Sequence, residues 1–189
     1  MKTRNIPNLV TSLRIILVPP FLLVLLKEHY SIAFLLFVIA GVSDALDGFL
    51  AKHYGWTSEL GGILDPIADK LLLVGAILVL GWLRDLPIWL VALAILRDLI
   101  IVTGAIGYHL IIERVQASPL FISKINTLVQ LLLVCIAIVS HGLISLPPWL
   151  LKTQVYITAL TTVWSGAAYV WQWSHQAWNT AHNNSDSEN

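Results

Sequence analysis

Four aspartates gather in the stretch from Ser43 to Lys70, between two long apolar segments of the chain. They are four of its eleven acidic residues: Asp44, Asp47, Asp65 and Asp69. A carboxylate inside hydrocarbon costs about 2.5–3.5 kcal/mol on insertion scales, and four close together also repel one another. Hard divalent cations bind carboxylate oxygens, so the cluster indicates one or two such ions held between the acids.

The spacing of the aspartates fits two helices that each present a pair of acids. Asp44 and Asp47 are three residues apart, and Asp65 and Asp69 are four apart, so each pair shares one face of a helix. Residues with almost no side chain continue these faces and leave room for a ligand against the backbone. They are Gly48, Ala51 and Gly61.

Such a cluster suits chemistry on a pyrophosphate. Bound metal neutralises phosphoryl oxygens, Lys52 adds a cation at the rim, and one carboxylate can take the proton from an attacking hydroxyl. Two other interpretations are open: solvated loop acids without a ligand, and the acidic ion site of a transporter. The chain shows no paired broken-helix repeat, which argues against the transporter.

Long apolar stretches supply the elements that would position these acids. Hydrophobic residues make up 57% of the 189 positions, and a membrane span needs about 20 mostly apolar residues. Six stretches qualify: 8–27, 31–52, 59–83, 87–112, 120–142 and 146–173. The sequence therefore predicts an all-α integral membrane protein with six transmembrane helices, one domain over residues 1–178 and a polar, disordered tail over 179–189.

Charge and composition indicate which partners and which cellular location the protein is expected to have. A formal net charge of zero gives no sign of a nucleic-acid partner, and the lone Cys135 excludes a disulfide framework. Basic residues favour the loops on one side, which predicts that both termini and the aspartate loop face the cytoplasm. The N-terminal stretch lacks a small-residue cleavage site and transit-peptide character, so we expect a multi-pass protein of a bacterial cytoplasmic (inner) membrane, in contact with its lipids.

The aspartates and their neighbours form a longer pattern, Asp44-x2-Asp47-Gly48-x2-Ala51-Lys52-x8-Gly61-x3-Asp65-x3-Asp69. It resembles the signature of the CDP-alcohol phosphatidyltransferases, D-x2-D-G-x2-A-R-x8-G-x3-D-x3-D, at seven of eight fixed positions. Lys52 replaces the usual arginine, which keeps the charge and loses the bidentate fork. The segments NIPNLVTSLRIILVPPF and LDPIADKLLLV resemble the branch that makes anionic glycerophospholipids.

The resemblance implies six transmembrane helices, a homodimer and a site on the cytoplasmic side. It implies that Asp44, Asp47 and Asp65 bind divalent metal, Mg²⁺ or Mn²⁺, and that Asp69 is both a ligand and the general base. The residues expected to bind the CDP-diacylglycerol substrate are Gly48, Ala51, Lys52, Ser58 and Gly61.

Two downstream segments bear on the alcohol that accepts the phosphatidyl group. ILRDLIIV and FISKINTLVQLLLV resemble the CMP-forming cardiolipin synthases, whereas relatives that use glycerol 3-phosphate more often show Arg-Glu and G-K-x-K-T. Asn126 stands where the second lysine would be, and a phosphomonoester carries about two negative charges. The resemblance therefore favours phosphatidylglycerol as acceptor, with glycerol 3-phosphate as the alternative.

The predicted acceptor residues are Arg97, Lys124 and Asn126. Each lies in one of the two downstream segments. A structural interpretation is open for them as well: Arg97 and Asp98 can form a structural pair, and Lys124 can extend along apolar surface to reach water.

Overall fold

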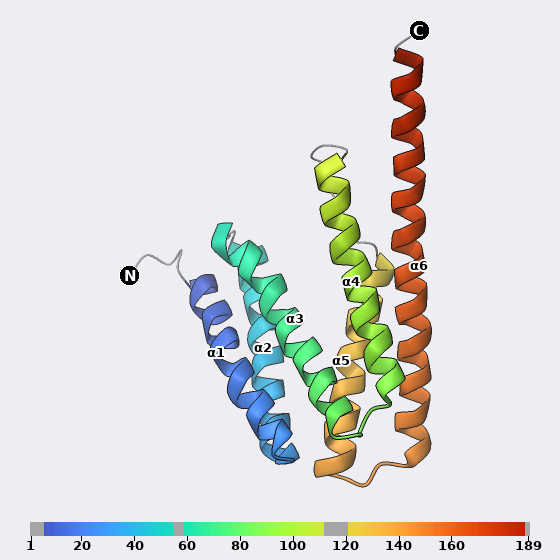
Figure 1. The fold of residues 1–189 in the computed structure, drawn as a ribbon. Helices are drawn as coiled ribbons and strands as arrows, with labels where there is room; N and C mark the ends of the chain where they lie inside the picture. The colour runs from blue at the N-terminus through green and yellow to red at the C-terminus, as the bar shows by residue number, and fades with distance from the viewer. Residues whose placement is uncertain (1–5, 55–58, 112–120, 188–189) are drawn as a thin grey trace. The chain divides into compact units, whose positions relative to one another are not determined.

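The computed structural model describes the backbone of residues 6–54, 59–111 and 121–187, and side chains within 14–43, 68–104 and 121–172 and at 174. In these ranges the chain forms six α-helices (Figure 1). They are α1 (Ile6–Leu26), α2 (Tyr30–Tyr54), α3 (Glu59–Trp82), α4 (Ile88–Ile111), α5 (Phe121–Gly142) and α6 (Pro148–Ser187). The predicted all-α class and the six helices are confirmed, and the first five helices begin and end close to the predicted apolar stretches.

The helix α5 is long and apolar enough to cross a membrane, and it is the one helix that meets both conditions within the described side chains. Two shorter apolar stretches are described in α1 and α2, Arg14–Leu26 and Tyr30–Ser43. The lengths of these three apolar stretches agree with a membrane protein. That all six helices cross the membrane stays a prediction.

The helices form two compact units. Unit 1 contains Met1–Pro87 and Val134–Leu151, and unit 2 contains Ile88–Leu133 and Lys152–Asn189. The boundary therefore runs along α5, whose beginning belongs to unit 2 and whose end belongs to unit 1. Both aspartate pairs lie in unit 1. The predicted acceptor residues, Arg97, Lys124 and Asn126, lie in unit 2.

In unit 1, helix α1 packs against both α2 and α3. Its buried side chains recur every three or four residues, which is the period of one helix face. On α1 they are Arg14, Val18, Phe21 and Leu25. The rings of Phe21 and Phe37 lie 5.8 Å apart between α1 and α2. This packing fixes α1 as the helix that touches both of the helices that bear aspartates.

Tight turns close α1 and α3 at the end of unit 1 away from the aspartates. Glu28 and Arg84 have φ values of 60° and 67°, the left-handed region that usually favours glycine. After α1, the N–H of His29 donates to the carbonyl of Val24 at 3.1 Å, so the turn satisfies carbonyls that the helix leaves open. Both turns lie where one predicted apolar stretch ends and the next begins.

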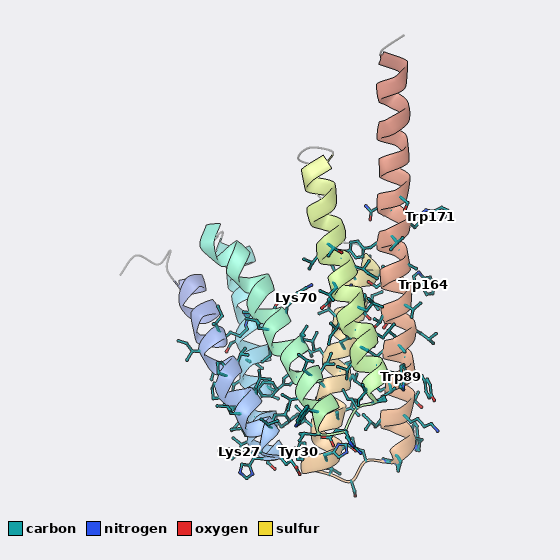
Figure 2. The ribbon with its side chains drawn as sticks, viewed as in Figure 1. Lys27, Tyr30, Lys70, Trp89, Trp164 and Trp171 are labelled. Carbon is teal, nitrogen blue, oxygen red and sulfur yellow. The ribbon has the colours of Figure 1, made fainter. Side chains whose placement is uncertain are left out.

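Tyr30, Asp85 and His141 join three elements at the same end of unit 1. The hydroxyl of Tyr30 donates to Oδ2 of Asp85 at 2.8 Å, and Nε2 of His141 lies 3.4 Å from Oδ1. Burial raises the pKa of the Tyr30 hydroxyl well above its ordinary value, and the hydrogen bond to Asp85 adds to the shift. Figure 2 shows Tyr30 beside Lys27 at this end of the unit.

Gly142 allows the last turn of α5 to approach the first turn of α2. A Cβ at Gly142 would lie 1.9 Å from Cβ of Tyr30, far inside contact distance. We expect Gly142→Ala to lower the free energy of unfolding by about 1–3 kcal/mol, because the two backbones must separate. Gly41→Ala is the matched control, since nothing lies within 4 Å of its added Cβ. Thermal unfolding in detergent checks this, and equal melting temperatures for the two variants would contradict it.

Unit 2 has an unusually polar core. Its buried side chains include Arg97 of α4, Asn126 and Gln130 of α5, and a stripe on α6. The α6 stripe consists of Thr158, Thr162, Ser165 and Tyr169. Buried polar groups persist in a fold when they bond to one another. Arg97 of α4 bonds to Ser123 of α5 and Ser165 of α6, and Thr162 of α6 bonds to Asn126 of α5, so these bonds orient the three helices.

Helix α6 is longer than predicted. It was expected to end near residue 173, with a disordered tail from 179, but the helix continues to Ser187. Residues 174–187 contain neither glycine nor proline, so no residue there breaks a helix that is already formed. Polarity alone was a poor guide to where this helix ends.

Candidate active site

The two aspartate pairs lie on two helices, as the spacing predicted. Asp44 and Asp47 are within α2, and Asp65 and Asp69 are within α3, so each pair occupies successive turns of one helix. The side chains of three of these aspartates are outside the described residues. The same holds for several predicted CDP-lipid residues: Gly48, Ala51, Lys52 and Gly61. Ser58 lies outside the described residues altogether.

Of the four clustered aspartates, Asp69 is the one whose side chain is described. Its carboxylate is 47% exposed, and Oδ1 accepts a hydrogen bond from Nη1 of Arg14 at 2.5 Å. Ala68 beside it is fully buried. Asp69 therefore lies at the edge of the contact between α1 and α3, partly open and with one oxygen held by a cation.

Arg14 is a residue of the site that the sequence interpretation did not single out. Its side chain is 1% exposed, although it is the only charged residue of α1. Arginine is almost never fully buried unless it is paired. A charged residue within an apolar helix that faces the protein interior is a signal of a functional site, and that signal was present in the sequence.

Arg97 lies in a buried hydrogen-bond network of unit 2. Its Nη2 donates to Oγ of Ser123 at 2.6 Å and to Oγ of Ser165 at 2.7 Å. Its Nη1 donates to Oδ1 of Asp98 at 2.7 Å, so the pair with Asp98 that was considered from the sequence does form. The stem of Arg97 passes 3.6 Å from the position of a Cβ on Gly166. The guanidinium thus ties α4 to both α5 and α6.

Asn126 lies in the same core and is fully buried. Its Oδ1 accepts hydrogen bonds from the hydroxyls of Thr161 at 2.9 Å and Thr162 at 3.0 Å. Within the described part of the chain, its Nδ2 has no hydrogen-bond partner. Lys124, by contrast, is exposed on α5. The structure therefore brings Arg97 and Asn126 into one buried region and leaves Lys124 at the surface.

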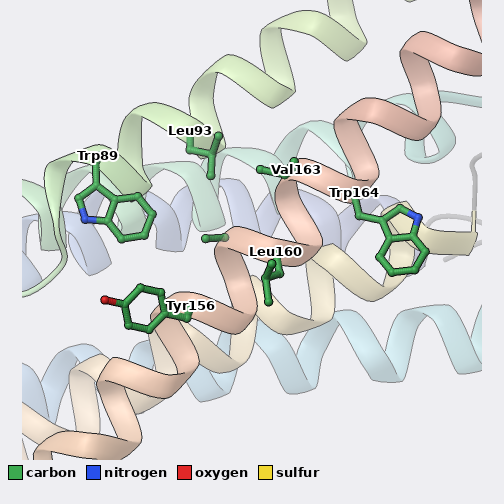
Figure 3. A pocket seen from close by; sticks show the side chains of 7 residues that line it. Trp89, Leu93, Tyr156, Leu160, Val163 and Trp164 are labelled. Carbon is green, nitrogen blue, oxygen red and sulfur yellow. The ribbon is translucent and has the colours of Figure 1, made fainter.

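A separate apolar cavity of about 650 Å³ lies between α4 and α6. Its lining, drawn in Figure 3, consists of Trp89, Leu93, Tyr156, Ala159, Leu160, Val163 and Trp164. The polar side-chain groups of this lining are the hydroxyl of Tyr156 and the indole N–H groups of Trp89 and Trp164. None of the lining side chains is charged, so the cavity lacks the groups that phosphoryl chemistry needs. Large exposed apolar side chains such as Trp164 and Trp171 are typical of surfaces that contact lipid or another protein.

The donor set fits a divalent metal. Carboxylates are the ligands that Mg²⁺ and Mn²⁺ prefer, and two helices of unit 1 each carry two aspartates a turn apart. The described carboxylate, Asp69, is neither deeply buried nor fully solvated. Among the described side chains no group of three potential ligands occurs, since the other three aspartates of the cluster lie outside them.

Comparison with known proteins agrees with this arrangement. Residues 4–167 match the family described as CDP-alcohol phosphatidyltransferase. The chain is 36% identical to a probable phosphatidylglycerophosphate synthase of Mycobacterium tuberculosis, over 88% of this chain and 80% of the relative.

Two further relatives carry different names. A CDP-diacylglycerol–glycerol-3-phosphate 3-phosphatidyltransferase of Blochmanniella floridana is 34% identical over 88% of this chain and 90% of its own length. A CMP-forming cardiolipin synthase of Rattus norvegicus is 32% identical over 87% of this chain and 60% of the relative. The family match covers most of the chain, including both aspartate pairs and the buried network of unit 2, and the chain belongs to the CDP-alcohol phosphatidyltransferase family.

Proposed function

We propose that this enzyme transfers a phosphatidyl group from CDP-diacylglycerol to a glycerol-type acceptor and releases CMP. The observation that carries the proposal is the pair of aspartates on each of α2 and α3, in a chain whose family transfers phosphatidyl groups from CDP-alcohols. The protein would act as a homodimer in the cytoplasmic membrane, with the aspartates and both termini on the cytoplasmic side.

Each residue of the site has a proposed task. Asp44, Asp47, Asp65 and Asp69 would hold one or two Mg²⁺ or Mn²⁺ ions, which neutralise charge on the two phosphates during transfer. Asp69 would also take the proton from the acceptor hydroxyl as that oxygen attacks the phosphatidyl phosphorus. The bond from this phosphorus to the CMP oxygen then breaks.

The remaining residues would hold the nucleotide-linked lipid. Gly48, Ala51 and Gly61 leave space for it against the backbone, and Lys52 and Ser58 would contact its polar head. Lys52 gives a point charge where the family pattern has arginine, so it can meet a phosphate oxygen without the two parallel bonds that arginine makes.

We propose phosphatidylglycerol as the acceptor, which gives cardiolipin. Of the two cations predicted to contact the acceptor, Arg97 is buried and bonded to Asp98, Ser123 and Ser165. Lys124 is then the exposed cation of the pair. A phosphodiester carries one negative charge and a phosphomonoester about two, so a site with one accessible cation suits the phosphodiester of phosphatidylglycerol better.

Glycerol 3-phosphate is the second candidate acceptor. It is favoured by the relatives named for that activity or its product, of which the two reported above are 34–36% identical to this chain.

A substitution at Asn126 would not distinguish the two acceptors cleanly. Asn126 is fully buried, so a lysine at this position would bury an ammonium group and would not extend the acceptor site. The choice between the two acceptors is therefore best tested on the wild-type protein.

In a mixed assay we expect phosphatidylglycerol to be used in preference to glycerol 3-phosphate. Purified protein is given CDP-diacylglycerol, Mg²⁺ or Mn²⁺ and both acceptors at equal concentration, and the lipid products are separated and quantified. Cardiolipin as the main product supports the proposal. Phosphatidylglycerophosphate without cardiolipin would reverse the order of the two acceptors and leave the reaction class intact.

A further inference from the structure

We propose that Arg14 is a positioning residue for Asp69, an inference that rests on the proposed function. Three observations carry it: the burial of the guanidinium, its place on the packed face of α1, and its direct bond to the carboxylate of Asp69.

The first observation is a charge where the helix pattern calls for an apolar side chain. Arg14 continues the buried face of α1 that Val18, Phe21 and Leu25 form. The guanidinium of arginine is protonated at all ordinary pH values. Burying it is unfavourable unless acceptors surround it, so an apolar residue would stabilise the packing of α1 at lower cost.

The second observation is the geometry of the bond. Nη1 of Arg14 lies 2.5 Å from Oδ1 of Asp69, and the two residues are 55 positions apart in the chain. A half-exposed aspartate on a helix has several rotamers available. A charge-assisted hydrogen bond from a packed arginine selects one of them, and this fixes the direction in which the second oxygen points.

The consequence concerns the step assigned to Asp69. A general base must lie within hydrogen-bond distance of the proton that it removes, and a misplacement of about 1 Å can cost about 100-fold in rate. Arg14 touches the carboxylate and acts on the reaction through it. Loss of Arg14 should therefore lower kcat and leave the KM for CDP-diacylglycerol nearly unchanged.

The experiment compares Arg14→Met, which keeps an unbranched apolar stem and removes the guanidinium, with Arg14→Lys, which keeps the charge. Lys27→Met is the matched control, since it removes a positive charge from the exposed turn that follows α1. We expect Arg14→Met to lower kcat by about 10- to 100-fold, Arg14→Lys to lie between it and the wild type, and Lys27→Met to match the wild type. An unchanged kcat with a raised KM would overturn the proposal, because Arg14 would then bind substrate.

A double-mutant cycle separates positioning from an independent role. If Arg14 acts through Asp69, then Arg14→Met combined with Asp69→Asn has no lower kcat than Asp69→Asn alone. Losses that multiply would overturn the proposal. If Arg14→Met does not fold, Arg14→Lys decides: a reduced kcat at a near-normal melting temperature supports the proposal, and a wild-type kcat overturns it.

Melting temperatures of the metal-free protein provide a readout that needs no turnover. Arg14→Met removes the donor of this bond and Asp69→Ala removes its acceptor. The shift of this double variant should therefore be smaller than the sum of the single shifts, whereas Arg14→Met and Lys27→Met should add. Additive shifts for Arg14 and Asp69 would overturn the proposal. If the wild type turned over no CDP-diacylglycerol, the proposed function would fail, and this cycle would still test whether Arg14 holds Asp69.

Discussion

Replacing Asp44, Asp47 or Asp65 with asparagine should reduce the turnover of CDP-diacylglycerol to the assay background while the protein still inserts into the membrane. Each change removes one negative charge and a strong oxygen ligand from the proposed metal site. Divalent-metal binding, measured by calorimetry on the purified protein, should weaken in parallel. The effect should be of this size because the metal would neutralise the phosphates during the transfer.

Glu28→Gln is the control for the loss of a carboxylate, since Glu28 is exposed in the turn after α1, away from the cluster. It should retain wild-type turnover and metal affinity. Chelation with EDTA should silence the wild-type protein, and added Mg²⁺ or Mn²⁺ should restore it. Full activity after exhaustive chelation would contradict the assignment of a metal centre to these aspartates.

Asp69→Asn should lower kcat by about 10²–10⁴-fold, the usual cost of removing a general base. It should nevertheless bind CDP-diacylglycerol more tightly than Asp44→Asn does, because the three aspartates that are proposed to act only as metal ligands, Asp44, Asp47 and Asp65, all remain. An asparagine oxygen can still accept the bond from Arg14, so the position of the side chain is largely kept while its basicity is lost.

Single-turnover rates and equilibrium binding of CDP-diacylglycerol to the Asp69→Asn and Asp44→Asn variants separate the two tasks of Asp69. If both variants bind the lipid equally poorly, Asp69 is mainly a metal ligand, and another group must accept the proton. The two outcomes differ in affinity as well as in rate, so the result does not depend on detecting a very slow reaction.

The helices were predictable because the length of each apolar stretch, and the polar residues and prolines that end it, can be read from neighbouring positions in the sequence. The turns at Lys27–His29 and before Pro87 separate apolar stretches of nearly constant length, and the structure places α1 to α5 in those stretches. The end of α6 was not predictable in the same way. Residues 179–187 are polar, which suggested disorder, yet they contain no residue that stops a helix.

The contacts around the site were harder to predict, because they join positions far apart in the sequence. Arg14 meets Asp69 across 55 residues, and Asn126 meets Thr161 and Thr162 across 35 and 36. Spacing within one helix cannot reveal such partners. A charge or a polar stripe inside an apolar helix does signal that partners exist, and Arg14 and the buried polar face of α6 both carried that signal.

The position of Asn126 also changes how the acceptor segment is understood. From the sequence, Asn126 was a position where a lysine would add a contact to the acceptor. In the structure its side chain is fully buried against two threonines of α6. We propose that Asn126 acts on the acceptor through the packing of α5 against α6, which its bonds to these threonines support.

The release of CMP from CDP-diacylglycerol tests the central claim most directly. Purified protein is incubated with the lipid, Mg²⁺ or Mn²⁺, and either phosphatidylglycerol or glycerol 3-phosphate, and both CMP and the new phospholipid are quantified. We predict CMP release that requires both metal and acceptor, with one phosphatidyl product formed for each CMP. No CMP release with either acceptor, together with solute flux across liposomes that contain the protein, would contradict the proposed function.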